Sequence, residues 1–251
     1  MLRALASLLF YSRFFTRFSR VGLRRRERDW LAYPERLDGQ TWLVTGASGG
    51  IGAAIASTAH ARGARVLAAA RSQEKLGELV RAAGDSGRMV PLRVDFSSIA
   101  DARRLLQELI SRGERIDVLI NNVGLLLDRF ELTPEGLETS FVTNLLSHYA
   151  LTEGLRTAGR FADGAAVINM SSGGMYGSPL RVSEMAAATA SEHDGMAAYA
   201  RPGRTDAGLE PAMARSSAGL RDAPGLGGHC RRADCPAGVP RHPAAVPAYC
   251  R

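Results

Sequence analysis

Lysine is almost absent from this sequence. The 251 residues carry a formal net charge of +7, yet 31 of the 32 basic side chains are arginine and only Lys75 is lysine. Arginine keeps its charge at every physiological pH, and its planar fork suits carboxylate and phosphate groups. Chemistry that needs a lysine side chain must therefore use Lys75 or do without one.

Cysteine and long apolar runs are also missing from most of the chain. All three cysteines, Cys230, Cys235 and Cys250, lie among the last 51 residues, and their odd number excludes a disulfide framework for the rest. A reducing compartment fits, so we expect a cytoplasmic protein. The uncharged stretch 4–12 is far too short to span a bilayer, which takes about 20 residues. His229 with Cys230 and Cys235 has no evident fourth ligand, so we expect no metal site.

Basic residues gather at the two ends of the chain. Residues 1–30 hold eight Arg and two acids, residues 201–251 hold eight Arg and four acids, and residues 31–200 hold 16 bases and 19 acids. The slightly acidic middle does not fit a nucleic-acid-binding face. Residues 1–28 also contain many Leu and Phe. They fit a peripheral contact with a membrane, a surface helix packed on the domain, or a targeting peptide.

Apolar runs and helical patterns alternate between residues 41 and 170, which predicts an α/β fold. We expect a doubly wound parallel sheet in a three-layer α/β/α domain at residues 31–200. The expected strands are 42–44, 65–70, 89–94, 118–120 and 165–170. The expected helices are 50–62, 73–83, 98–112 and 133–158.

The composition changes at Arg201. The last 51 residues contain seven of the eleven prolines, seven glycines, ten alanines and eight arginines, and no Ile, Phe, Trp or Lys. Such a segment buries too little apolar surface to offset its loss of conformational entropy. We expect residues 201–251 to be disordered or poorly packed, which would leave the sheet incomplete on its C-terminal side.

A glycine-rich turn follows the first expected strand. Thr45-Gly46-Ala47-Ser48-Gly49-Gly50-Ile51-Gly52 joins this strand to a helix, whose free N–H groups can hold a pyrophosphate. Four further features follow: VDF at 94–96, NNVG at 121–124, Asn144 in a helix, and NMSSGGMYG at 169–177. Together they resemble the short-chain dehydrogenase/reductase family over about residues 40–200. Among its branches, the chain is most similar to the retinol-dehydrogenase-like and dehydrogenase/reductase member 12 groups.

The resemblance implies a Rossmann-type, NAD(P)-binding domain at residues 31–200 and a set of cofactor contacts. Asp95 would accept a hydrogen bond from the adenine amino group, and the alternative is a helix-capping or surface role. The full set of implied contacts is Thr45, Gly46, Ser48, Gly50, Ile51, Gly52, Arg71, Asp95, Phe96, Asn122 and Gly124.

The end of the second strand indicates the form of the cofactor. An acid there would bind the ribose 2′-hydroxyl of NAD, whereas an arginine pairs with the 2′-phosphate of NADP. The chain reads Leu67-Ala68-Ala69-Ala70-Arg71-Ser72, with no acid. NADP(H) is therefore favoured over NAD(H), and the alternative is that Arg71 is a solvated residue at the start of a helix.

The resemblance also implies a catalytic set of Ser172, Tyr199 and Asn144. Tyr199 would exchange a proton with the substrate oxygen, Ser172 would hold that oxygen, with Ser171 as the alternative, and Asn144 would support a water-linked relay. In the family, a lysine four positions after the tyrosine lowers the pKa of that tyrosine. Here that position is Gly203, and a proline precedes it.

The missing lysine and the change of composition coincide at residues 201–203. Arg201 and Arg204 are poor substitutes for a lysine because the guanidinium fork is longer and planar, and Pro202 interrupts the helix that should carry Tyr199. A GC-rich gene read out of frame yields much Arg, Ala, Gly and Pro. We therefore hypothesise that the reading frame shifts after about residue 200.

The sequence as a whole predicts an NADP(H)-dependent oxidoreductase with impaired chemistry. It would transfer hydride between the cofactor and a carbonyl or alcohol, with a lipophilic small molecule as one candidate substrate. The resemblance also raises a homo-oligomer as an expectation. The alternative function is a dinucleotide-binding module without catalysis, either a pseudoenzyme or a frameshifted product.

Overall fold

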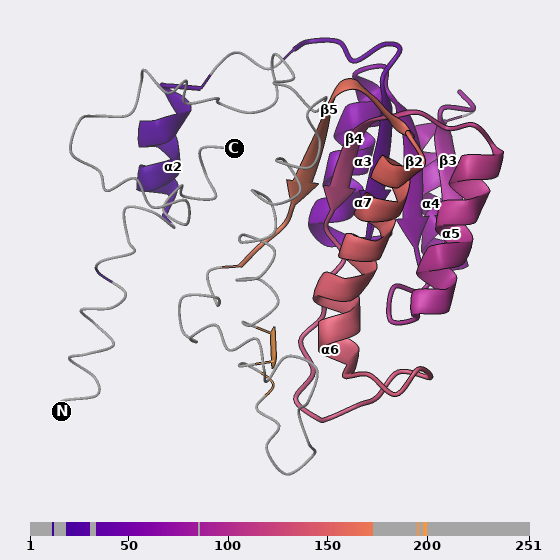
Figure 1. Cartoon of the computed structure of the whole chain (residues 1–251). Coiled ribbons are helices and arrows are strands. Elements are labelled where there is room, and N and C mark those ends of the chain that lie inside the picture. The colour runs from indigo at the N-terminus through magenta and orange to yellow at the C-terminus, as the bar shows by residue number, and fades with distance from the viewer. Residues whose placement is uncertain are drawn as a thin grey trace.

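The computed structural model describes residues 12, 19–30, 34–84, 86–172, 195, 198 and 199. A short helix, α2 (Arg20–Glu27), precedes five strands that alternate with helices (Figure 1). The strands are β1 (Thr41–Thr45), β2 (Arg65–Ala70), β3 (Met89–Arg93), β4 (Ile116–Asn121) and β5 (Phe161–Asn169). The helices among them are α3 (Gly50–Ala61), α4 (Gln73–Ala83), α5 (Ile99–Ser111), α6 (Thr139–Phe141), a π-helical turn η1 (Val142–Leu146) and α7 (Ser147–Thr157).

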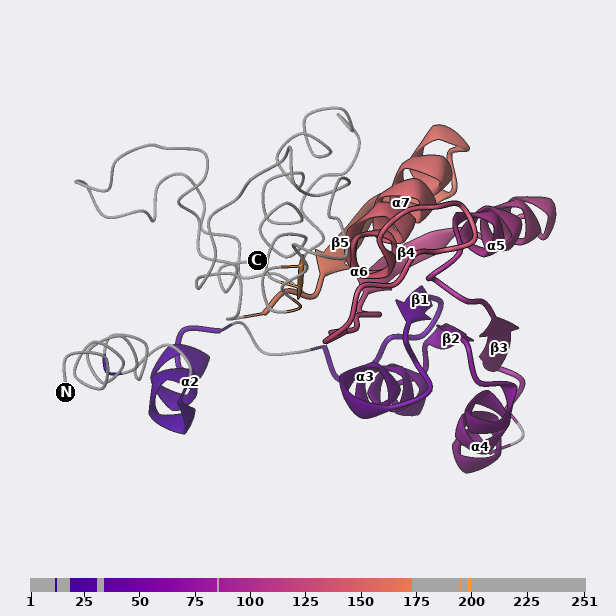
Figure 2. The ribbon, with the colours of Figure 1, turned by 90° about the horizontal axis from the view of Figure 1, so that it is seen from below.

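The strands form one parallel sheet in the order β3-β2-β1-β4-β5. The chain runs outward from β1 through β2 to β3 and then crosses back to place β4 on the other side of β1. Figure 2 shows the five strands in this order, with α3 and α4 on one face and α5 and α7 on the other. In such sheets, ligands bind beyond the carboxyl ends of the strands where the strand order reverses, which here lies between β1 and β4.

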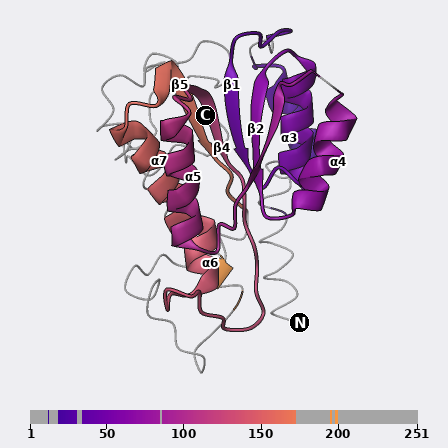
Figure 3. The same ribbon diagram turned by 90° about the vertical axis from the view of Figure 1, so that its right-hand side faces the viewer.

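Helices cover both faces of the sheet (Figure 3), and an apolar layer on each face holds them to it. On one face, Val44, Val66 and Ala68 pack with Ala56 of α3 and Leu76 of α4. On the other face, the alternate residues of the same strands pack against α5 and α7: Leu43, Leu67, Ala69 and Leu119 meet Leu105, Leu109, Leu151 and Leu155. Because both faces are covered, β2 reads as an almost continuous apolar run. The predicted three-layer α/β/α fold is confirmed.

The expected helix 133–158 begins later than the sequence indicated. Residues 131–138 form a tight loop in which Leu132 bridges Glu138, and Gly136 has φ +78°. A helix cannot continue through that backbone conformation. Instead, the Glu138 carboxylate accepts hydrogen bonds from the N–H groups of Ser140 (2.8 Å) and Phe141 (2.6 Å), and α6 starts at Thr139. Glutamate here serves as the N-cap of the helix.

Two expectations about the ends of the chain lie outside the described residues. Residues 201–251, with the expected disorder and the candidate frameshift, are not described, and neither are residues 1–18 except Ser12. In the part of the chain that is described, no helix is long and apolar enough to cross a membrane.

Candidate nucleotide-binding site

The glycine turn between β1 and α3 has a packed side and an open side. A Cβ atom on Gly52 would collide with the carbonyl oxygen of Gly46 and lie 2.5 Å from Nδ2 of Asn122. Added Cβ atoms on Gly49 and Gly50 would meet nothing within 4 Å, and Ile51 is 61% exposed. Gly46 and Gly50 have φ values of +68° and +52°, which favour glycine. The N-terminus of α3 therefore faces open space over bare backbone, as an anion site requires.

Thr45 and Asn122 join the carboxyl ends of the two central strands. The Thr45 hydroxyl donates to the Ile120 carbonyl (3.2 Å) and accepts from the N–H groups of Asn122 (2.8 Å) and Val123 (3.1 Å). The Asn122 amide donates to the Thr45 carbonyl at 2.9 Å. Thr45 is fully buried. Both residues thus build the floor of the site and set the distance between β1 and β4.

Asn121 ties β4 to the strand that leads to the expected catalytic serine. Its amide nitrogen donates to Thr152 Oγ1 of α7 (3.0 Å) and to Asn169 Oδ1 of β5 (2.8 Å). The Met170 N–H donates to the Asn121 carbonyl at 2.8 Å. The sequence did not reveal Thr152 or Asn169 as partners, because these contacts depend on the register of β4 with β5 and on the packing of α7.

The outer part of the candidate site lies at the ends of β2 and β3. Arg71, directly after β2, is exposed, and no acid is present between Ala70 and Gln73. Asp95 follows β3 and is half-buried, and its Oδ1 accepts from the N–H (3.0 Å) and the hydroxyl (2.7 Å) of Ser97. Phe96 is buried, and its ring meets that of His148 edge-on with centroids 6.2 Å apart.

The side chain of Asn144 holds the loop after β4 through both ends of its amide group. Its Oδ1 accepts from the Leu125 N–H and its Nδ2 donates to the Leu125 carbonyl, both at 2.8 Å. A Cβ on Gly124 would lie 3.6 Å from the same Oδ1. Asn144 sits in the π-helical turn η1, a feature that is frequent at functional sites. The amide group therefore fixes segment 124–125, and the relay proposed for this residue stays a prediction.

The two remaining members of the expected catalytic set belong to separate described pieces of the chain. Ser172 lies three residues beyond β5 and is half-buried, and Tyr199 is half-buried in helical backbone. Nearby Gly195 packs on the loop after β4, because an added Cβ would collide with the Leu127 carbonyl oxygen and lie 3.2 Å from Asp128 Cα. Gly203 lies outside the described residues, so its predicted consequence for Tyr199 also stays a prediction.

Polar contacts hold the N-terminus of α5, which Ser98 caps. Ser98 Oγ accepts from the Asp101 N–H at 3.2 Å, and Glu135 Oε1 accepts from the Ser98 hydroxyl (3.2 Å) and the Ala100 N–H (3.3 Å). The Ser98-x-x-Asp101 spacing is close to that of a capping box, so the first contact has a local signal in the sequence. Glu135 lies 37 residues after Ser98 and 35 after Ala100, and it could not be placed without the loop 131–138.

Comparison with known proteins identifies the family. Residues 40–191 match the family model described as short chain dehydrogenase. The chain belongs to the short-chain dehydrogenase/reductase family. This is a family of NAD(P)-dependent oxidoreductases, as the resemblance of the motifs implied.

Several relatives of this short-chain dehydrogenase carry the names expected from the motifs. Retinol dehydrogenase 14 of Mus musculus is 36% identical over 149 residues, which cover 54% of this chain and 44% of the mouse protein. Dehydrogenase/reductase SDR family member 12 of Homo sapiens is 29% identical over 235 residues, covering 88% and 73% of the two chains. The chain thus spans less than half the length of the mouse relative.

A solved structure shares the fold at a TM-score of 0.58. It is described as an NAD(P)-dependent gluconate 5-dehydrogenase from Beutenbergia cavernae with NADP bound at low occupancy. The two chains are 26% identical, and the match covers 76% of this chain and 71% of the other.

Proposed function

We propose that this short-chain dehydrogenase binds NADP(H) beyond the carboxyl ends of β1, β2 and β4. The observation that carries the proposal is the open side of the glycine turn at the N-terminus of α3, above a floor closed by Thr45 and Asn122. The donor set fits the group, because bare N–H groups suit a pyrophosphate and exposed Arg71 suits a 2′-phosphate.

The proposed reaction is hydride exchange with a carbonyl or alcohol. Bound NADP(H) would supply or accept the hydride. Ser172 would donate a hydrogen bond to the substrate oxygen, and Tyr199 would exchange a proton with the same oxygen. Leu126 and Met170, exposed by 42% and 37%, follow β4 and β5 and add apolar surface at this end of the sheet. With the retinol dehydrogenase name of the mouse relative, they favour a retinoid-like lipid substrate.

We infer that catalysis is impaired in this chain. The family lysine is replaced by Gly203, and an unassisted tyrosine hydroxyl with a pKa near 10 is a poor base at neutral pH. The frameshift hypothesis explains the loss of the family lysine. The match to the human relative, however, covers 88% of the chain and therefore extends beyond residue 200. Sequencing codons 195–205 of the gene tests the hypothesis, and a confirmed in-frame reading would overturn it.

A titration with NADPH and NADH, followed by the fluorescence of the reduced nicotinamide, tests the cofactor proposal. We expect NADPH to bind, and to bind more tightly than NADH. Arg71→Ala should remove most of this preference, a loss of roughly ten- to hundredfold for a phosphate–guanidinium pair. Lys75→Ala is the matched control, because it removes one positive charge from α4, the helix that follows Arg71. Equal loss in both variants would contradict a specific role for Arg71.

An assay with aldehydes and ketones, including retinal, tests the competence of the chain. We expect binding of NADPH without turnover, and no rescue by Gly203→Lys alone, since Pro202 still interrupts the helix. Rapid turnover by the unaltered chain would contradict impaired catalysis. Turnover restored by Gly203→Lys alone would overturn the frameshift explanation. The binding-module alternative gains support if no variant with an intact tyrosine helix is active.

A further inference from the structure

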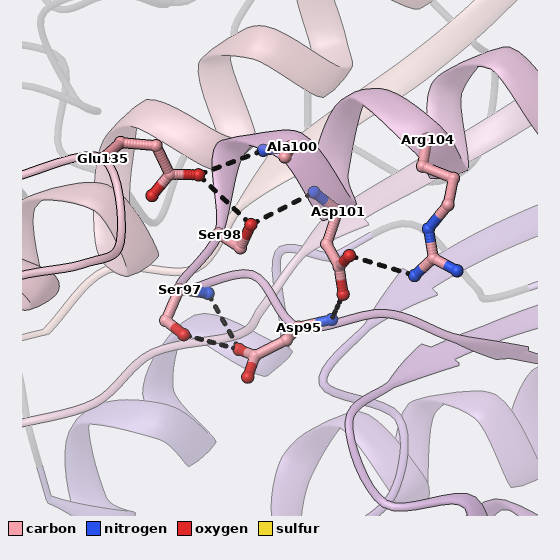
Figure 4. Close-up of polar contacts among 7 residues, drawn as sticks. All are labelled: Asp95, Ser97, Ser98, Ala100, Asp101, Arg104 and Glu135. Carbon is pink, nitrogen blue, oxygen red and sulfur yellow. Dashed lines mark hydrogen bonds and ion pairs between the residues drawn. The ribbon is translucent and has the colours of Figure 1, made fainter.

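The loop between β3 and α5 holds Asp95 from two sides (Figure 4). Oδ1 of Asp95 accepts two hydrogen bonds from Ser97, one from the main-chain N–H at 3.0 Å and one from the hydroxyl at 2.7 Å. The Asp95 N–H donates to Oδ2 of Asp101 at 3.2 Å, and the other oxygen of Asp101 pairs with Arg104 at 3.1 Å. Main chain and side chain of Asp95 are therefore fixed separately.

The two oxygens of the Asp95 carboxylate have different surroundings. Ser97 supplies both donors to Oδ1, whereas Oδ2 carries no hydrogen bond from the residues that the structure describes. A carboxylate oxygen can accept about two hydrogen bonds, so Oδ2 keeps its capacity for an external donor. Because the side chain is only half-buried, such a donor can reach it from solvent.

The two adjacent serines, Ser97 and Ser98, make different hydrogen bonds at this loop. Ser98 is the N-cap of α5, since its hydroxyl oxygen accepts from the Asp101 N–H at 3.2 Å, and it also contacts Glu135. The Ser97 hydroxyl makes its hydrogen bond to the Asp95 carboxylate instead. Ser98 thus caps the helix and Ser97 orients the carboxylate. A substitution at either residue removes one of these two contacts and leaves the other.

We propose that Ser97 is a positioning residue for adenine recognition. Its hydroxyl holds Oδ1 of Asp95, so that Oδ2 is presented in one orientation to the 6-amino group of the adenine. The proposal rests on the proposed NADP(H) site. A carboxylate that is already oriented loses less conformational freedom when the ligand binds, so the benefit is seen only with a ligand that carries the amino donor. Ser97 itself would not touch the cofactor.

Binding of two nucleotides that differ only at this group tests the proposal. NADPH is compared with its hypoxanthine analogue, in which the 6-amino group is replaced by a carbonyl oxygen, by fluorescence titration of each variant. We expect the unaltered chain to prefer NADPH by roughly tenfold or more, and Asp95→Ala to lose the preference. Ser97→Ala should reduce the preference by about threefold or more, and Ser97→Thr, which keeps a hydroxyl, should restore it.

Ser98→Ala is the matched control. It removes a helix cap next to Ser97, so it should lower the melting temperature without changing the ratio of the two affinities. If Ser97→Ala weakens both nucleotides equally or leaves the ratio unchanged, the positioning role is overturned and the nucleotide site stands. Equal binding of both nucleotides by the unaltered chain would also overturn it. Absence of NADPH binding would overturn the site itself, and the inference with it.

Discussion

At the scale of single residues, the glycines of the turn differ in what surrounds them. Gly52 lies in helix α3, where alanine would normally gain about 1 kcal/mol from helix propensity. The space that an alanine methyl group would need at Gly52, however, is occupied by the backbone of Gly46 and the amide of Asn122. Gly49 precedes the helix in extended backbone with φ −173° and has open space around it. A substitution at Gly52 therefore tests the packing of the turn, and a substitution at Gly49 tests access of a ligand to it.

We expect Gly52→Ala to lower the free energy of unfolding by about 2 kcal/mol or more, since the collision with a backbone carbonyl outweighs the gain in propensity. Gly49→Ala should change it by less than about 0.5 kcal/mol, yet weaken NADPH binding, because the new methyl group occupies the open side of the turn. Urea unfolding and NADPH titration of both variants measure these effects. Similar unfolding curves for the two variants would contradict the packing described for Gly52.

The sequence predicted the positions of those site residues that belong to a short motif or to a local turn. The turn from Thr45 to Gly52 could be placed because glycines with positive φ and a strand-to-helix junction leave a readable pattern. Asn169 and Glu135 could not, since each acts on a residue at least 35 positions away in the chain. Such contacts depend on strand register and on one irregular loop, and neither is encoded in a short stretch of sequence.

At the scale of elements, α7 buries an ionisable side chain against the loop after β3. His148 is 3% exposed beside Phe96, and its Nε2 has no hydrogen-bond partner among the described residues. Burial lowers the pKa of His148 to about 4. The unfolded chain, with a histidine pKa near 6.5, therefore binds more protons than the folded chain between these two values.

Stability should fall as the pH decreases from about 6.5 towards 4. The contribution of His148 is fully present above pH 6.5, and its loss is on the order of 3 kcal/mol at the acid end. His148→Leu should flatten the decline between pH 7 and 5 and leave stability at pH 7 nearly unchanged. Urea unfolding at several pH values measures both effects. His60, whose pKa burial also lowers, should leave a residual slope, and an unaltered slope in the variant would contradict the burial of His148.

The boundaries of an element were predicted less well where a helical pattern of apolar residues overlaps with turn-forming residues. The stretch 133–158 contains enough apolar periodicity to suggest one helix, but Pro134 and Gly136 introduce a turn inside it. The start at Thr139 depends on Glu138, a residue that ordinarily favours helix interiors. The strands β1, β2 and β4 were placed to within two residues, because two-sided burial makes them short apolar runs. The predicted strand 165–170 instead begins at Phe161, since β5 is mostly half-buried and its first residues include Asp163 and Gly164.

At the scale of the whole molecule, charge is separated between the N-terminal segment and the domain. In the described part of that segment, Arg24, Arg25 and Arg28 are exposed, as are Val21 and Leu23 at 59% and 50%. Arginine near an anionic bilayer contributes about 1 kcal/mol each, and exposed apolar side chains add to it. We propose that this segment supports peripheral contact with anionic membranes.

The full chain should therefore sediment with phosphatidylserine-containing vesicles and much less with neutral phosphatidylcholine vesicles. Charge reversal of Arg24, Arg25 and Arg28 to Glu should abolish the difference, since three charges account for roughly a hundredfold in binding. The same reversal at Arg81, Arg93 and Arg103, all exposed on the domain, is the matched control. Equal losses in both triple variants would show that only net charge matters.

The pairing of β1 with β4 also sets an order of events during synthesis. The Thr45 hydroxyl makes hydrogen bonds to residues 75 to 78 positions later in the chain, whereas β1 meets β2 after only 24 residues. A nascent chain can therefore close the β1–β2–β3 side of the sheet while the floor of the nucleotide site is still missing. The floor of the proposed nucleotide site is completed only when Val123 has left the ribosome, so we expect a nucleotide bound at that site to stabilise the domain only after β4 has formed.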